Sequence, residues 1–162
     1  MTIASSLSLQ IFLKTQVLRD AQAVRFPGPG PRAGAGVHAD DAAVNVLLFV
    51  TPDRHNRGSP GAGTGGGLVV HRRPAPQHWD LALSPGAPGH AAAAVRAFLA
   101  RGGEGNATVA YKCNRAVIFD ANLFYETDAF DFTDTYAGWR TSLTLLYGER
   151  GRADMSQGLG MS

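Results

Sequence analysis

The stretch HADDAAVNVLLFVTPD, residues 38–53, carries the signal that decides the fold. Its second half, from Val44 to Val50, is a nearly continuous apolar run rich in β-branched residues and leucine, which predicts a buried strand. Thr51 and Pro52 close that strand, since proline cannot donate to a β-ladder. His38 and Asp40 precede the run. In extended backbone these two side chains, at i and i+2, point the same way and can reach one ion together.

Short apolar runs recur outward from this stretch, separated by turn-forming residues. Four of them predict strands: residues 68–71, 107–111, 116–119 and 142–147. Residues 7–13 also alternate as a strand does, although Leu9, Leu13 and Val17 equally fit one face of a helix. The Ala-rich residues 90–100, followed by Gly102, predict the single clear helix. This arrangement favours an antiparallel sandwich or barrel.

Composition limits the class of protein. The 162 residues suit one domain, and the 15 Lys and Arg against 13 Asp and Glu give a net charge of only +2. This balance argues against a nucleic-acid-binding tail, and we expect no nucleic-acid partner. The single cysteine excludes an internal disulfide and a cysteine-based zinc site. No apolar run approaches the roughly 18 residues of a membrane-spanning helix. The substrate, whether a small molecule or a peptide, and the oligomeric state stay open.

The predicted organisation has three parts. Residues 1–35 form an N-terminal strand or helix with a Gly/Pro linker, residues 36–150 form the main domain, and residues 151–162 form a frayed tail. Residues 1–19 contain Lys14 and Arg19 and no acid, which is compatible with an organellar targeting segment. They lack a clean apolar core, so an ordinary first element in a cytoplasmic protein is the other interpretation.

Arg140 and Ser142 form a second candidate site at the start of the apolar run 142–147. Two residues apart on a strand, they share one face. A guanidinium holds a carboxylate through two parallel hydrogen bonds, and a hydroxyl can add a third, which suits the far carboxylate of a dicarboxylic acid. The alternative is an internal ion pair with one of the acidic residues that precede it, namely Glu126, Asp128, Asp131 or Asp134.

Four ordered blocks resemble one family. They are HADDAAVNVLLFVTPD (38–53), GGLVVHRRPAPQHWD (66–80), NRAVIFDANLFYETD (114–128) and WRTSLTLLYGER (139–150). Together they resemble an uncharacterised branch of the 2-oxoglutarate- and Fe(II)-dependent oxygenase superfamily, over roughly residues 36–150. The resemblance implies an all-β, cupin-like jelly roll, a double-stranded β-helix, with one or two flanking helices.

The resemblance also implies a dioxygenase that couples oxidative decarboxylation of 2-oxoglutarate to hydroxylation of an unknown substrate. His38 and Asp40 would be the first two Fe(II) ligands. Arg140, with Ser142 beside it, would bind the distal carboxylate of 2-oxoglutarate.

The sequence departs from the family at the third iron ligand. The family has histidine in its L-F-H-E-T-D block, and this chain has Tyr125. A phenol with a pKa near 10 is mostly neutral at pH 7 and is a poor Fe(II) ligand. Three interpretations stay open: Tyr125 ligates weakly, a nearby histidine such as His71 substitutes, or the protein is an inactive relative that serves as a binding or scaffold module.

Overall fold

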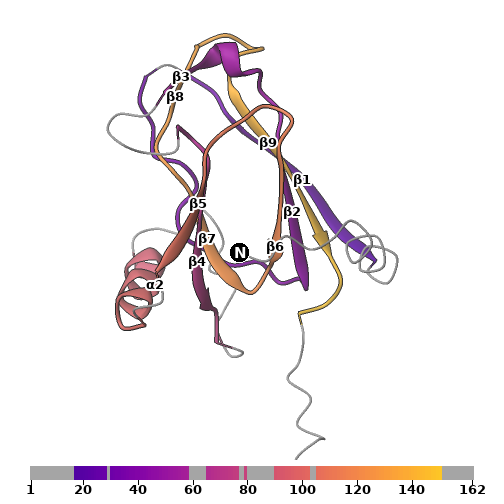
Figure 1. Ribbon diagram of the computed structural model, residues 1–162, viewed down its shortest axis with the longest axis vertical. Helices are drawn as coiled ribbons and strands as arrows, with labels where there is room; N and C mark the ends of the chain where they lie inside the picture. The colour runs from indigo at the N-terminus through magenta and orange to yellow at the C-terminus, as the bar shows by residue number, and fades with distance from the viewer. Residues whose placement is uncertain are drawn as a thin grey trace, which may run out of the picture.

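The computed structural model describes residues 17–28, 30–58, 65–76, 79, 90–102 and 105–150. Within them the chain forms two main antiparallel sheets that face each other and a third sheet of two strands (Figure 1). The larger sheet has the order β1 (Leu18–Phe26), β9 (Arg140–Tyr147), β2 (Val44–Phe49) and β6 (Ala116–Asp120). The smaller sheet has the order β5 (Asn106–Val109), β4 (Leu68–Pro74) and β7 (Leu123–Thr127).

Short elements close one end of the sandwich, drawn at the top in Figure 1. They are the 3-10 turn η1 (Asp53–His55) and the paired strands β3 (Asn56–Gly58) and β8 (Asp131–Phe132). Phe132 and Phe130 are buried there and join the main core.

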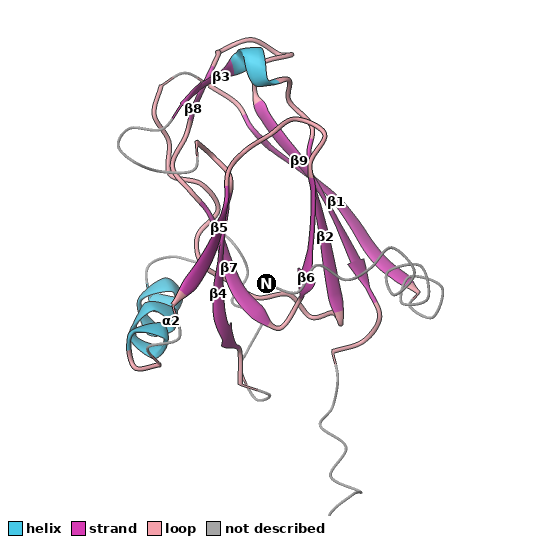
Figure 2. Cartoon of the chain, viewed as in Figure 1, coloured by secondary structure: helices cyan, strands magenta, loops and turns pink. Residues whose placement is uncertain are grey.

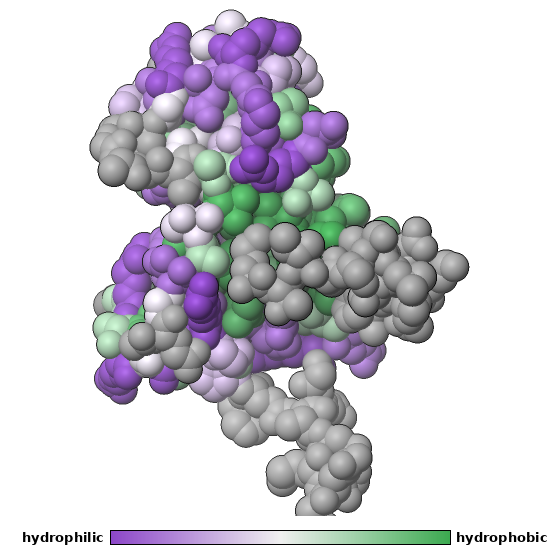
Figure 3. Space-filling model, viewed as in Figure 1, coloured by the Kyte–Doolittle hydropathy of each residue, from purple (hydrophilic) through white to green (hydrophobic). Residues whose placement is uncertain are grey.

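The core between the sheets follows from alternation along the strands. Strand β9 buries every second residue, from Arg140 to Leu146, and leaves the residues between them half-buried on the outer side. Side chains from both sheets fill the interior: Leu47, Phe49, Leu68, Val70, Tyr111, Tyr125, Phe130 and Phe132. Apolar residues also gather in the middle of the face seen in Figure 3, between hydrophilic regions at its two ends.

Helix α2 (His90–Ala100) packs beside the smaller sheet (Figure 2). Val95 on the helix is buried against Phe124, whose side chain faces away from the main core. Trp79 adds contacts of its ring to Phe98 and Phe124. The helix thereby covers the outer face of the smaller sheet. Among the described residues, no helix is long and apolar enough to cross a membrane.

The predicted all-β jelly-roll fold is confirmed, with one described α-helix at the predicted residues 90–100. Strand β1 lies in the predicted N-terminal part and pairs with β9 along its length. The predicted strand at residues 7–13 and the tail 151–162 lie outside the described residues. Cys113, between the two predicted strands at 107–111 and 116–119, lies in the turn between β5 and β6 and is half-buried.

Candidate functional site: a cavity between the two sheets

A cavity of about 480 Å³ lies between the sheets. The backbone of residues 34–36 forms one wall, because this segment pairs with β7 through the Thr127 amide, which donates to the Ala35 carbonyl. A side chain on Gly34 would collide with Thr127, so glycine is required for this close approach. The cavity is lined by His38, Asp40 and Tyr125 of the first predicted group and by Ser142 of the second, whereas Arg140 does not line it.

His38 is fixed by its backbone and by one hydrogen bond of its ring. Its amide donates to the Tyr125 carbonyl at 3.0 Å, and its carbonyl accepts from the Tyr125 amide at 2.8 Å. The ring Nδ1 lies 2.6 Å from the Gly36 carbonyl oxygen. A carbonyl only accepts, so Nδ1 carries the proton and the lone pair of Nε2 is left for another partner. Histidine ligands of metals are commonly oriented in this way.

Asp40 lies outside the strands, and its carboxylate is bound by two neighbours. The Tyr125 hydroxyl donates to Oδ2 at 2.8 Å, and the Asn45 side-chain amide donates to the same oxygen at 2.5 Å. Burial raises the pKa of Asp40, while the electrostatic interaction with His38 and these two hydrogen bonds oppose the rise. The carboxylate is thus held in place by residues of this chain.

Tyr125 is 4% exposed and stands directly beside His38, with their ring centroids 4.3 Å apart. Burial, followed by the negative charge of Asp40, raises its pKa well above 10. Tyr125 is therefore a neutral phenol whose hydroxyl donates a hydrogen bond to Asp40. The predicted ligand set comes together in space, but its third member acts as a hydrogen-bond donor.

These groups do not fit a complete iron site. A facial triad on Fe(II) needs two imidazoles and one carboxylate. No group of three or more His, Cys, Asp or Glu side chains within the described part of the chain could hold a metal. His38 and Asp40 supply two donors, and the Tyr125 proton occupies one oxygen of the carboxylate.

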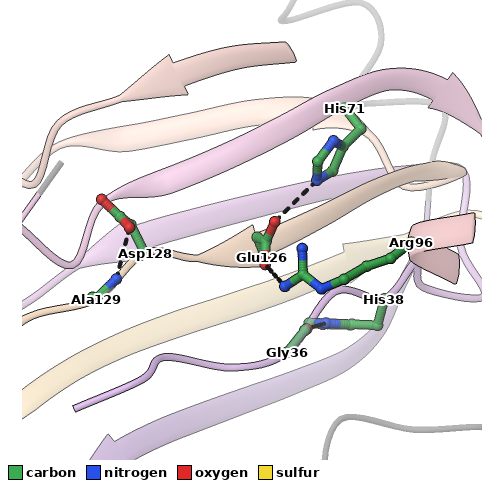
Figure 4. Close-up of polar contacts among 7 residues, drawn as sticks. All are labelled: Gly36, His38, His71, Arg96, Glu126, Asp128 and Ala129. Atoms are coloured by element: carbon green, nitrogen blue, oxygen red, sulfur yellow. Dashed lines mark hydrogen bonds and ion pairs between the residues drawn. The ribbon is translucent and has the colours of Figure 1, made fainter. Parts of the chain in front are cut away.

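His71 does not substitute for the missing ligand. Val70, its neighbour on β4, is paired with Tyr125 and belongs to the core, so His71 points to the opposite face of the smaller sheet. There its Nε2 lies 3.2 Å from Glu126, which also binds Arg96 of helix α2 at 2.7 Å (Figure 4). The interpretation that His71 completes the site is therefore wrong on geometric grounds.

Arg140 is fully buried, and two of its three guanidinium nitrogens have no partner. Nε donates to the Gly66 carbonyl at 2.9 Å, but Nη1 and Nη2 are buried without a hydrogen bond among the described residues. Four aromatic rings surround the guanidinium: Phe26, Phe49, Tyr111 and Phe130, with centroids 5.3–5.9 Å from Cζ. Burial lowers its pKa to about 10, so it is still a cation at neutral pH.

The internal ion pair considered as an alternative for Arg140 is absent among the described residues. Ser142 lies two residues further on the same inward face of β9, 4% exposed, and lines the cavity. Phe26, which pairs with Arg140 across β1 and β9, lines it too. Arg140 itself does not line the cavity, but the residue paired with it and the residue two positions further on do, and its guanidinium has two unused donors. A carboxylate is the group that matches two parallel N–H donors.

Two residues of the site escaped the sequence interpretation. Asn45 interrupts the apolar run 44–50, and a polar residue inside a buried strand is itself a signal, because it needs a hydrogen-bond partner. Gly66, which accepts from Arg140, had no distinguishing signal within its glycine-rich surroundings.

One solved structure supports the fold. It is described as an oxidoreductase of the 2OG-Fe(II) oxygenase family from Burkholderia pseudomallei, and it superposes with a TM-score of 0.50 at 16% sequence identity. The similarity covers 92% of this chain and 54% of that one, so this chain spans about half of that protein's length. No protein-family model matches the chain, and no curated protein matches it. At this identity the similarity shows a shared fold.

Proposed function

We propose that the chain is an oxygenase-fold protein that binds a dicarboxylate of the 2-oxoglutarate type through Arg140 and Ser142, without depending on iron. The observation that carries this proposal is the fully buried guanidinium with two unpartnered nitrogens. Each buried donor left unpaired costs about 1–3 kcal/mol, and a bound carboxylate removes that cost for both at once.

The other end of the cavity supports binding rather than oxidation. Tyr125 replaces an imidazole and donates to Asp40, so iron would have to displace that hydrogen bond and would gain only two good ligands. The protein then acts as a binding or scaffold module whose occupancy follows the concentration of the dicarboxylate.

A second candidate function is that of a 2-oxoglutarate- and Fe(II)-dependent dioxygenase with weakened iron binding. The orientation of His38 favours it, because the bond from Nδ1 to Gly36 leaves Nε2 ready for a metal. In this case His38 and Asp40 would hold the iron, and the substrate is an unknown small molecule or peptide.

Calorimetry and turnover separate the two functions. The wild-type chain is titrated with 2-oxoglutarate, succinate and acetate in the presence of a chelator, and succinate formation from 2-oxoglutarate is measured with added Fe(II) and oxygen. The binding proposal predicts that both dicarboxylates bind, that acetate binds far more weakly, and that no succinate forms. Turnover that rises with Fe(II) would establish the dioxygenase instead.

A further inference from the structure

The outer face of the larger sheet is apolar across all four strands. The strand registers align eight side chains in two rows. One row is Ala21, Leu145, Val46 and Ile118, and the other is Ala23, Leu143, Leu48 and Ala116. We call these eight residues the outer apolar face. Not one of them is charged, although an antiparallel sheet that faces water on one side normally alternates with polar residues there.

No described element covers the outer apolar face. The leucines and Val46 are half-buried, Ile118 is 40% exposed, and the alanines are exposed. None of the eight belongs to any of the apolar clusters of buried residues. The described helix α2 lies beside the smaller sheet, away from the larger one (Figure 2). The two sheets therefore differ: helix α2 covers the outer face of the smaller sheet, and no described element covers that of the larger sheet.

The size of the outer apolar face argues against a second copy of the chain as its partner. Four strands about 4.8 Å apart and two rows about 7 Å apart give roughly 270 Å². A stable interface between two separate proteins buries about 800 Å² on each partner. A tethered segment needs much less area, because its attachment gives it a high local concentration.

Residues 1–16 have the composition and the attachment point for this role. They join β1, the edge strand of the larger sheet, at Val17, whose carbonyl accepts from the Gly148 amide just beyond β9. Their apolar residues include Leu9 and Leu13, and Lys14 is their only charged side chain. Sixteen residues reach about 24 Å even as a helix, which is longer than the sheet is wide.

We propose that residues 1–16 dock on the outer apolar face of the larger sheet and cover it as helix α2 covers the smaller sheet. Leu9 and Leu13 are the anchors, because four residues apart they share one face in a helix and in a strand alike. This surface lies on the opposite side of the sheet from the cavity, so the proposal is independent of the proposed function.

A double-mutant cycle on the full chain tests the contact. Leu9→Ala, Leu145→Ala and their combination are unfolded with urea, and the equilibrium constants of unfolding are compared. If Leu9 and Leu145 are in contact, the double variant should change the equilibrium constant of unfolding by a factor that differs at least fivefold from the product of the two single-variant factors. The matched controls pair Gln10→Ala with Leu145→Ala, and Leu9→Ala with Thr108→Ala, an exposed position on β5 of the smaller sheet. Their effects should multiply to within about twofold, as those of independent sites do. Ile118→Ala replaces Leu145→Ala if the latter fails to fold.

Sedimentation of the wild-type chain completes the test, with a monomer expected. If the chain is a monomer and the effects of Leu9→Ala and Leu145→Ala on the unfolding constant simply multiply, the proposal is wrong, because residues 1–16 then do not contact the outer apolar face. Multiplicative effects in a dimer that Leu145→Lys dissociates would overturn it in favour of a second copy.

Discussion

The charged groups in the cavity and beside it contrast in how they are satisfied. Beside the cavity, the Arg140 guanidinium makes a single hydrogen bond, and two of its nitrogens are buried without a partner in the described chain. In the cavity, the Asp40 carboxylate receives hydrogen bonds from Tyr125 and Asn45. The guanidinium therefore needs an anion from outside, whereas the carboxylate is already paired within the protein. A ligand therefore gains most binding free energy by pairing with Arg140.

Removing the cation should have the largest effect. Arg140→Met keeps the bulk of the side chain but removes both unpaired donors, so we expect 2-oxoglutarate binding to weaken by on the order of 2–5 kcal/mol, which calorimetry measures. Arg140→Lys should recover little, because an ammonium cannot form the two-pronged bond. The urea midpoint of Arg140→Met should not fall, since an unpaired buried charge is removed. Unchanged affinity in Arg140→Met would remove Arg140 from the site.

Adding a third metal ligand beside His38 and Asp40 should have the next largest effect, on metal affinity. Tyr125→His replaces the donor to Asp40 by a third metal ligand beside His38, and Mn(II) binding should tighten at least tenfold, about 1.4 kcal/mol. Tyr125→Phe is the matched control, because it removes the same hydrogen bond and adds no ligand. Equal metal affinity in the wild type, Tyr125→His and Tyr125→Phe would show that position 125 does not limit metal binding.

The stability cost of Asp40 should be smaller and should depend on pH. A buried carboxyl whose folded pKa is raised contributes stability at low pH that is lost as pH rises through that pKa. Asp40→Asn keeps an acceptor for Tyr125 and Asn45 and should raise the free energy of unfolding at pH 7 by about 1 kcal/mol. It should also flatten the acid side of the pH profile measured by urea unfolding.

Asp53 is the control for Asp40, with the opposite sign. Its pKa is lowered, first by the Cys113 amide and then by Lys112, so the stability it contributes is present at neutral pH and lost on acidification. Asp53→Asn should therefore lower the urea midpoint at pH 7. Finding that both variants change stability in the same direction would contradict this account of Asp40.

The smallest expected effect lies at the hydroxyl beside Arg140. Ser142→Ala removes one neutral hydrogen bond to the ligand, worth about 0.5–1 kcal/mol, so calorimetry should show roughly threefold weaker 2-oxoglutarate binding. Thr141→Ala, which lies on the outer side of the same strand, should leave the affinity unchanged. Equal losses at both positions would mean that the effect comes from the strand and not from the cavity.

Much of this fold was predictable because period-two alternation is a local property. The run 44–50 and the run 142–147 became neighbouring strands with their alternate residues inside, and residues 90–100 became the helix. The conformation of the turn between the runs 107–111 and 116–119 was not predictable, because alternation along strands does not describe turns. Asn114 in this turn has a φ of 63°.

For the candidate site, the sequence singled out residues but could not show how they are hydrogen-bonded. The sequence placed Arg140 and Ser142 on one strand face, and it singled out His38, Asp40 and Tyr125 as a set. The structure places that set and Ser142 along one cavity, with Arg140 buried outside its lining. The sequence could not show that Tyr125 donates to Asp40, since that bond joins residues 85 positions apart. His71 was misjudged because a single register decides which face of β4 it occupies.

Titration of the wild-type chain with 2-oxoglutarate, in a chelator and again with saturating Mn(II), tests the central claim most directly. The account predicts binding in both conditions with dissociation constants within about threefold of each other, because the carboxylate is held by Arg140 and not by a metal. Binding that appears only when Mn(II) is present, or no binding in either condition, would contradict it.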